Sequence, residues 1–206
     1  LGGIRQGDEV IISAHTMIAT AGAIVQAGAK PIPVDIGDDH LIDTNLIEEK
    51  ITPKTRAIMP THLNGRTCEM DSILEICKNH NLLLFEDAAQ ALGSKFKNRN
   101  AGTFGISSAI SFYPAKSLGC LGDGGAILTN SEEIYTQALA YRDHGRDPIS
   151  GEVINWGVNS RLDNIQARIL DHFLLDFEKV INRRRQIAEI YQKNLEKSHF
   201  LKYIQK

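Results

Sequence analysis

Short apolar runs separated by helical patterns are the feature that most limits how this 206-residue chain can fold. Each run holds four or five residues, rich in Ile, Val, Leu and Phe, as expected of strands buried on both faces. The alternation predicts an α/β fold with a mostly parallel sheet between two helical layers, a three-layer α/β/α arrangement. The predicted strands cover residues 10–13, 31–35, 57–60, 82–85, 109–112 and 125–129.

Helical patterns fill the gaps between these strands, and capping residues mark where some of them begin. Thr44 and Ser131 each precede such a pattern, and both residue types favour the N-cap position. The two prolines of residues 31–35 predict that this strand lies at an edge or an end of the sheet. The predicted helices cover residues 18–27, 45–50, 70–80 and 132–141.

The last part of the chain carries one long helical pattern, from Asp163 to Leu195, with three consecutive arginines at 183–185. Its length predicts a spine that connects two domains. We therefore expect a large ligand-binding domain over residues 1–160 and a long linking helix over 161–206. Glutamates stand among the arginines, which favours a solvated or subunit-facing helix surface over a nucleic-acid site.

Composition excludes several classes of function. A formal net charge of −2 gives no reason to expect nucleic acid or an anionic membrane as partner. No apolar run is long enough to span a bilayer. The three cysteines and seven histidines show no spacing typical of metal ligands, so no metal is expected. Free cysteines in this number predict reduced thiols and a cytoplasmic protein.

Two stretches carry side chains that can take part in catalysis. The apolar run 82–85 ends in Glu86 and Asp87, as a buried strand does when it delivers an acid to the ligand-binding edge of a sheet. Lys116 follows the strand 109–112 and stands before a glycine-rich turn. Together Asp87 and Lys116 match what pyridoxal 5'-phosphate (PLP) requires, a lysine for its aldehyde and an acid for its pyridine nitrogen.

Four motifs in this order resemble one known family. They are Glu86-Asp87-Ala88-Ala89-Gln90-Ala91, Ser111-Phe112-Tyr113-Pro114-Ala115-Lys116, Gly122-Asp123-Gly124-Gly125 and Gly157-Val158-Asn159-Ser160-Arg161-Leu162-Asp163. The chain is similar over nearly its whole length to the PLP fold-type-I sugar-nucleotide aminotransferases of the DegT/DnrJ/StrS group. The resemblance implies the large domain of a PLP-dependent transferase, similar to that of aspartate aminotransferase.

The resemblance also implies a role for each matching residue. Lys116 would be the Schiff-base lysine and the proton carrier, and Asp87 would pair with the pyridine nitrogen. Gln90 would approach the ring hydroxyl. The remaining cofactor-binding positions would be Ala89 and Met17 against the ring, Ser111 at the phosphate, and Asn159 at the phosphate of the neighbouring subunit in a homodimer.

Ordinary structural roles remain open for the same residues. Asp87 could be a turn or helix-cap acid, and Gln90 and Ser111 could be plain hydrogen-bonding residues. Asn159 could cap the long helix, because Asn favours that position. The Gly122–Gly125 stretch reads as a turn, since no helix with a phosphate-loop pattern follows it.

The chain departs from the family pattern in three ways. Met17 stands where the family usually sets an aromatic over the ring, and Ala115 replaces a frequent glycine. The resemblance also places a phosphate-binding Gly-Thr turn before residue 1 and a small C-terminal domain after residue 206. We therefore expect that both ends of the whole protein are missing from this chain.

The activity that the resemblance implies is transfer of an amino group from an amino acid, most often glutamate in such families, to a keto sugar nucleotide for amino-sugar biosynthesis. One alternative is other PLP chemistry on sugars, such as dehydration, although the dehydratase branch has a histidine where Lys116 stands. A second is a non-catalytic regulatory relative of the same fold, which would need neither Asp87 nor Lys116. A Rossmann nucleotide site is disfavoured, because no GxGxxG follows the first strand.

Overall fold

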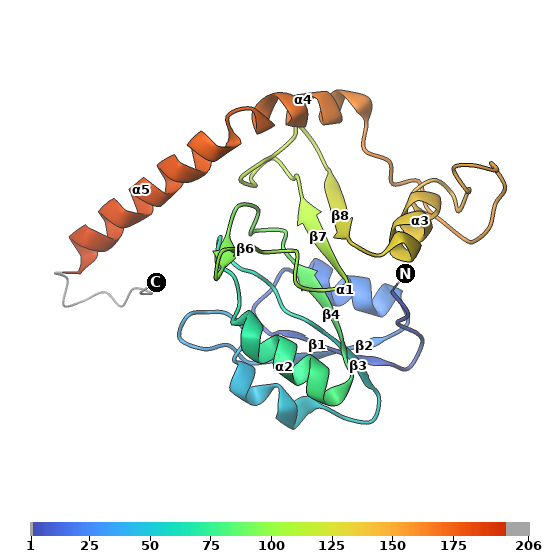
Figure 1. The fold of residues 1–206 in the computed structure, drawn as a ribbon, viewed down its shortest axis with the longest axis horizontal. Helices are drawn as coiled ribbons and strands as arrows, with labels where there is room; N and C mark the ends of the chain where they lie inside the picture. The colour runs from blue at the N-terminus through green and yellow to red at the C-terminus, as the bar shows by residue number, and fades with distance from the viewer. Residues whose placement is uncertain (1, 197–206) are drawn as a thin grey trace.

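The computed structural model describes residues 2–196 and contains a six-stranded sheet with helices on both faces (Figure 1). The strand order is β2-β1-β3-β4-β7-β8, and every neighbouring pair is parallel except β7 and β8. The predicted mostly parallel α/β/α fold is confirmed. The sheet strands are β1 (Glu9–Ser13), β2 (Lys30–Val34), β3 (Thr55–Met59), β4 (Leu83–Asp87), β7 (Ser107–Ser111) and β8 (Gly125–Thr129).

All six predicted strands are present, and the proline-containing β2 lies at an edge as expected. The sequence did not predict the small hairpin of β5 (Lys95–Phe96) and β6 (Arg99–Asn100). β4 extends two residues beyond its predicted end, because Glu86 and Asp87 still pair with β7. The two carboxylates therefore belong to the strand and point to opposite faces of the sheet.

Three predicted helices are confirmed: α1 (Ile18–Gln26), α2 (Met70–His80) and α3 (Glu132–Tyr141). Ser131 caps α3 as predicted, since its Oγ accepts a hydrogen bond from the Ile134 amide at 3.3 Å.

The predicted helix over residues 45–50 is wrong. The segment forms two short 3₁₀ turns, η1 (Thr44–Leu46) and η2 (Glu48–Lys50). Asp43, rather than Thr44, caps the first of them by accepting a hydrogen bond from the Asn45 amide at 3.0 Å. Ile47 lies between the two turns and is fully buried, so core packing fixes the chain at the point where a longer helix would have to continue.

The predicted single helix from Asp163 to Leu195 is also wrong. It is two helices, α4 (Asn164–Leu174) and α5 (Phe177–Leu195). At the junction Asp176 has a non-helical backbone (φ −110°, ψ 6°), and its amide bonds to the carbonyl of Phe173 three residues earlier. Such a tightened turn commonly ends a helix, and an acid is favourable where the next one starts. The last part of the predicted linking unit over 161–206, residues 197–206, lies outside the described residues.

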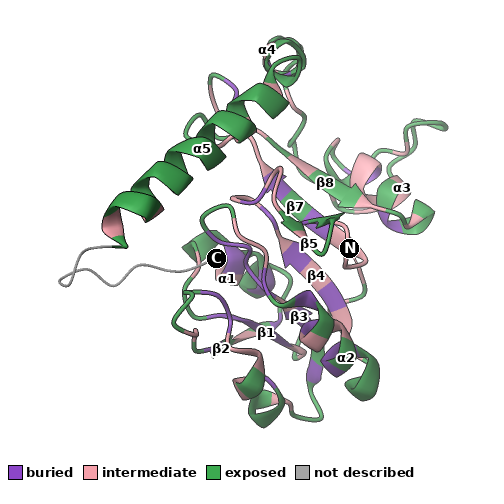
Figure 2. Cartoon of the chain, turned by 60° about the vertical axis from the view of Figure 1, so that its left-hand side comes forward, coloured by how far each residue is buried: buried purple, intermediate pink, exposed green. Residues whose placement is uncertain are grey.

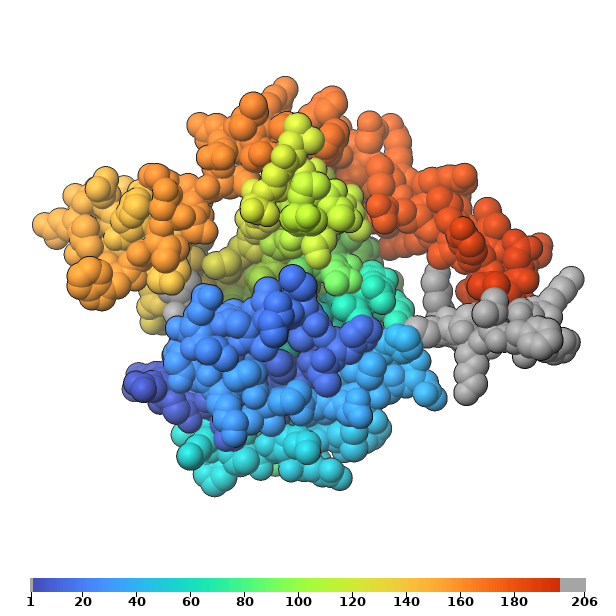
Figure 3. All heavy atoms as spheres, turned by 180° about the vertical axis from the view of Figure 1, so that it is seen from behind, coloured from blue at the N-terminus to red at the C-terminus, as the bar shows by residue number. Residues whose placement is uncertain are grey.

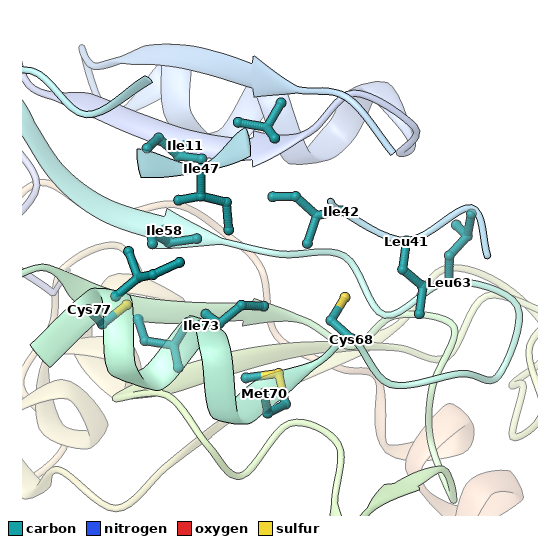
Figure 4. Packing of buried hydrophobic residues seen from close by; sticks show 13 residues of the cluster. Ile11, Leu41, Ile42, Ile47, Ile58, Leu63, Cys68, Met70, Ile73 and Cys77 are labelled. Carbon is teal, nitrogen blue, oxygen red and sulfur yellow. The ribbon is translucent and has the colours of Figure 1, made fainter. Parts of the chain in front are cut away.

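Different helices cover the two faces of the sheet. Ile11 and Ile58 point toward α2 and form the larger core with Ile73 of that helix (Figure 4). Ile12 packs on the opposite face against Ile24 of α1. Burial is concentrated along the central strands, whereas α5 is exposed over nearly its whole length (Figure 2).

β4 continues this alternation to its end. Leu84 belongs to the core on the α2 side, and Glu86 follows it on that face. Leu83 and Phe85 pack on the α1 side, and Asp87 follows them there. One strand thus delivers a buried acid to one face and a second acid to the other.

The part of the chain that the structure describes contains no helix long and apolar enough to cross a membrane. Within residues 2–196 no group of three or more His, Cys, Asp or Glu side chains is placed to hold a metal ion. The cysteines Cys68, Cys77 and Cys120 are free and buried. Burial raises the pKa of the Cys68 thiol to about 12 and that of Cys77 to about 11, so both are protonated.

Candidate active site

The carboxyl ends of the parallel strands open into a cleft of about 1600 Å³, and α5 lies along its other side. Ligands of open α/β sheets bind at this edge. Six of the seven site residues predicted from the sequence line this one cleft, although they come from separate segments of the chain. They are Met17, Asp87, Ala89, Gln90, Ser111 and Lys116.

Asp87 is held at the end of β4 by donors on both of its carboxylate oxygens. The Thr20 hydroxyl donates to Oδ2 at 2.6 Å, and the Ala89 amide donates to Oδ1 at 3.1 Å. The backbone of Asp87 is fixed as well, because its amide bonds to the carbonyl of Pro60 and its carbonyl accepts from the His62 amide. The carboxylate is therefore a rigid acceptor on the α1 face. It is neither a helix cap nor a turn residue, since it belongs to a strand.

Lys116 lies in a tightly folded loop between β7 and β8. Its amide bonds to the carbonyl of Tyr113 at 2.9 Å, and the amide of Cys120 bonds to the carbonyl of Phe112 at 2.8 Å. Gly119 makes this fold possible, because a Cβ there would lie 2.7 Å from the carbonyl oxygen of Pro114. The Lys116 side chain is half-buried at the cleft, and none of the ion pairs among residues 2–196 involves it. Its amine is therefore available to a ligand in the cleft.

α4 supports this loop from the outside. Leu170 packs against Leu118 and Cys120 in a small buried cluster. Gln166 accepts a hydrogen bond from the amide of Leu121 at 2.8 Å. The helix that the sequence assigned to a separate linking unit thus helps to position the Lys116 loop.

The other predicted cofactor-binding residues already make local contacts. Ser111 Oγ accepts a hydrogen bond from the Tyr113 amide at 3.3 Å, and Gln90 Oε1 accepts one from the Asn64 amide at 3.1 Å. A hydroxyl has a further lone pair and its proton, and an amide has its NH₂ group, so both residues retain capacity for a ligand. Met17 is 64% exposed at the cleft, where its sulfur can pack on a ring.

Asn159 is the predicted residue that does not line the cleft. It forms an isolated bridge with Asp143 and is exposed. The reading of Asn159 as a helix cap is wrong, because α4 begins at Asn164 and Asp163 occupies its N-cap position. Asn159 belongs to the segment between α3 and α4, which projects from the side of the molecule (Figures 1 and 3).

Several cleft residues were missed by sequence reasoning. Thr20 lies in a stretch that reads only as a small-residue helix, and Thr61 follows a strand without any motif. Arg66 and Arg184 also line the cleft. The three arginines at 183–185 are exposed, in agreement with the predicted solvated surface, but no spacing in the sequence indicates that α5 lines one side of the cleft.

Five other residues were weaker candidates for a substrate pocket, each equally readable as a structural loop residue: His15, His62, Asn64, Arg142 and His144. Only Asn64 lines the cleft. His62 is fully buried, and its Nε2 lies 2.9 Å from Glu86 Oε2. His62 is therefore part of the interior rather than of the pocket.

Glu86 is a buried anchor on the opposite face of the sheet. Its carboxylate accepts hydrogen bonds from the amides of Gly102, Phe104 and Gly105 at 2.6–2.7 Å. His62 completes the set, because its Nδ1 accepts from an amide and its Nε2–H is left to donate to Glu86. Burial by itself raises the pKa of a carboxyl, yet the hydrogen bonds from His62, Gly105 and Gly102 outweigh it. The pKa of Glu86 therefore lies below its ordinary value of 4.5.

The sequence model of the DegT/DnrJ/EryC1/StrS aminotransferase family matches residues 1–205. A dTDP-3-amino-3,4,6-trideoxy-alpha-D-glucose transaminase of Streptomyces venezuelae is 42% identical over 195 residues, which are 94% of this chain and 51% of that protein. A pleiotropic regulatory protein of Geobacillus stearothermophilus is also 42% identical, over 95% of this chain and 53% of its own length.

The crystal structure of S. venezuelae DesV in complex with a ketimine intermediate has the same fold as this chain. The TM-score is 0.89 at 40% identity, and the match covers 94% of this chain and 52% of that one. The chain thus spans about half the length of the curated relatives that it matches.

Proposed function

This chain belongs to the DegT/DnrJ/EryC1/StrS aminotransferase family, and from that premise we propose that its protein is a PLP-dependent aminotransferase. It would move an amino group from an amino acid, glutamate, to a keto sugar nucleotide. The observation that carries the proposal is the convergence of six residues, predicted from separate motifs, on one cleft at the carboxyl edge of the sheet. The fold itself is that of PLP-dependent aminotransferases of fold type I.

The cleft residues fit the family's cofactor, PLP. Four residues line the same space: the carboxylate of Asp87, the amine of Lys116, the small side chain of Ala89 and the thioether of Met17. When bound, PLP supplies an aldehyde that takes up amino groups and a protonated ring that accepts the electron pair released at the donor carbon.

The chain's own groups would carry out the proton transfers. Lys116 Nζ would take the proton from the α-carbon of the amino acid and return it to the cofactor side, as a positioned general base and acid. The Asp87 carboxylate would accept a hydrogen bond from the protonated ring nitrogen and so keep the proton there. Its orientation is already fixed by its own hydrogen bonds. Gln90 and Ser111 would use their remaining hydrogen-bonding capacity at the ring hydroxyl and the phosphate.

Arginines at the cleft support an anionic substrate. Arg66 lines it from the loop after β3, and Arg184 and Arg185 line it from α5. Guanidinium groups match phosphate oxygens in geometry as well as charge. A sugar nucleotide carries its charge on such phosphates, so these residues favour it over a neutral sugar.

An absorption experiment tests the reaction class. The purified protein supplied with PLP is expected to show a visible band that disappears on treatment with borohydride and on addition of glutamate. Keto sugar nucleotides should then restore the band from the glutamate-treated protein. A protein that gives no band with PLP, or a band that no amino acid changes, would contradict the proposal.

We also propose a homodimer in which Asn159 contributes to the partner's site. In its own chain Asn159 lies outside the cleft, on a projecting segment. This segment exposes large apolar side chains, with Ile149 95% and Trp156 96% exposed. Exposure of that extent marks a surface for another protein, and a second copy would bring Asn159 toward a cleft.

Replacing Trp156 with aspartate is expected to shift the protein from dimer to monomer and to weaken PLP binding. A central aromatic at an interface contributes about 2 kcal/mol or more to association. Sedimentation measures the first effect and titration with PLP the second. Val25→Asp, on the exposed side of α1, is the control for adding an acid to an exposed apolar position. A dimer that survives Trp156→Asp with unchanged PLP affinity would rule out this interface.

Two finer assignments rest on the sequence. We propose that residues 1–160 belong to the PLP-binding domain and residues 161–206 lead toward a small second domain, although α4 already packs on the Lys116 loop. We also propose a cytoplasmic location, which the three free cysteines support.

A regulatory role is the second candidate, because one relative is named a pleiotropic regulatory protein. The presence of Asp87 and Lys116 in one cleft favours catalysis over a purely regulatory fold. The same lysine disfavours sugar dehydration, for which a histidine is expected at that position. A variant of Lys116 that loses the visible band but keeps the protein's interactions with other proteins would show that the two roles are separate.

A further inference from the structure

Three threonines form a chain of hydroxyl groups that ends on Asp87. Thr61 Oγ1 lies 2.8 Å from Thr16 Oγ1, which lies 2.7 Å from Thr20 Oγ1, which donates to Asp87 Oδ2 at 2.6 Å. Thr20 and Thr61 are buried, at 5% and 3% exposure. Thr16 comes from the loop before α1, Thr20 from α1 itself and Thr61 from the segment that follows β3.

The number of protons fixes the direction of this chain. A hydroxyl has one proton, and Thr20 gives its proton to Asp87. Thr20 must therefore accept from Thr16, and Thr16 must in turn accept from Thr61. All three O–H dipoles point their positive ends toward the Asp87 carboxylate.

The position of Thr20 also argues against a purely local role. A threonine in the first turns of a helix commonly bonds to a neighbouring backbone group. Thr20 instead donates its only hydroxyl hydrogen bond to a carboxylate 67 residues later in the chain. The other carboxylate oxygen of Asp87 likewise receives a donor, the Ala89 amide. Every contact to this carboxylate thus comes from a donor, an arrangement that suits a group which must remain an acceptor.

We propose that Thr20, oriented by Thr16 and Thr61, is a positioning residue that keeps Asp87 as the hydrogen-bond acceptor of the cofactor's ring nitrogen. This inference rests on the proposed function. A proton moved from the ring to Asp87 would make this carboxyl a weaker acceptor, and both the Thr20 hydroxyl and the Ala89 amide donate to it. The chain of hydroxyls therefore favours the arrangement in which the ring keeps its proton.

The test compares Thr20→Val with Thr20→Ser. Valine keeps the shape and removes the donor, whereas serine keeps the donor. Titration of the apoprotein with PLP is expected to show about tenfold weaker binding for Thr20→Val, the lower range for a lost hydrogen bond to a charged group. The cofactor's absorption band should also change its pH profile in this variant. Thr20→Ser should bind within about twofold of the wild type and keep the profile, because it retains the hydroxyl.

Thr52→Val is the matched control. Thr52 donates to Glu9 Oε2 at 2.6 Å, the same kind of bond at the same length, near the amino ends of β1 and β3 and away from the cleft. It should leave PLP binding and the pH profile unchanged.

The outcomes separate this inference from the proposed function. If the wild type binds PLP and Thr20→Val binds it equally well with the same pH profile, the positioning role is overturned. The role is also overturned if Thr20→Ser loses as much as Thr20→Val, since packing would then be responsible. If the wild type itself does not bind PLP, the proposed function fails, and this inference fails with it.

Discussion

Lys116→Ala is expected to lower turnover by at least roughly 10²–10⁴-fold, the contribution of a positioned proton-transfer group. The loss should be greater still, because the same amine is proposed to hold the cofactor covalently. Borohydride treatment followed by mass spectrometry should attach PLP to the wild type at Lys116 and leave the variant unlabelled. PLP would bind the variant only non-covalently.

Two further variants make the result specific. Lys116→Arg keeps the positive charge, but its guanidinium does not lose a proton in proteins, so it should be as inactive as the alanine variant. Lys95→Ala removes an exposed lysine of β5 and should retain activity and labelling. Labelling of Lys116→Ala at wild-type level would show that another amine holds the cofactor.

Glu86→Ala is expected to destabilise the protein by at least about 3 kcal/mol, because it leaves several buried donors without an acceptor at a cost of about 1–3 kcal/mol each. The donors are the His62 ring and three amides of the segment before β7. For a chain of this size the melting temperature should fall by about 6 °C or more. Thermal unfolding followed by circular dichroism measures the change.

The effect of Glu86 should depend on pH in a defined direction. The pKa of Glu86 is lower in the folded protein than its ordinary value of 4.5, so the unfolded chain takes up the proton first on acidification. The stability that the carboxylate contributes is complete above about pH 4.5 and is lost as the pH falls through the lower folded pKa. Glu86→Gln should remove this part of the acid sensitivity, and its deficit against the wild type should shrink below pH 4.5.

Urea unfolding at neutral pH and across the acidic range distinguishes this account from a general charge effect. Glu75→Gln is the control, because Glu75 is an exposed carboxylate on α2 with the same change of charge. It should alter stability by a few tenths of a kcal/mol at most. An equal loss of stability in Glu75→Gln and Glu86→Gln at neutral pH would refute the anchoring role.

The sequence predicts the sheet because burial in a parallel sheet demands continuous apolar runs, and those runs are visible without any knowledge of the fold. It predicts Asp87 and Lys116 because each follows such a run. It does not predict the break at Asp176, since the apolar spacing continues through it and only local backbone geometry ends the helix. The 3₁₀ turns at 44–50 were missed for a similar reason, because burial of Ile47 overrides helix propensity.

Only some of the cleft residues can be predicted from the sequence. Strand ends of parallel strands must share an edge, so the convergence of Asp87, Ser111 and Lys116 follows from the strand pattern alone. Thr20 and Arg184 could not be placed in this way, because their contribution depends on how α1 and α5 pack. The spacing of residues within one helix or strand does not show which side chains will contact another helix or strand.

The sequence by itself determined the class of fold, the family and the pair of residues proposed for the chemistry, since strand burial and motif order are local properties of the chain. Only the tertiary structure decided that Glu86 and Asp87, neighbours in the chain, serve opposite faces of the sheet. The reason is the pleat of β4, which turns adjacent side chains apart and gives one acid to the interior and the other to the cleft.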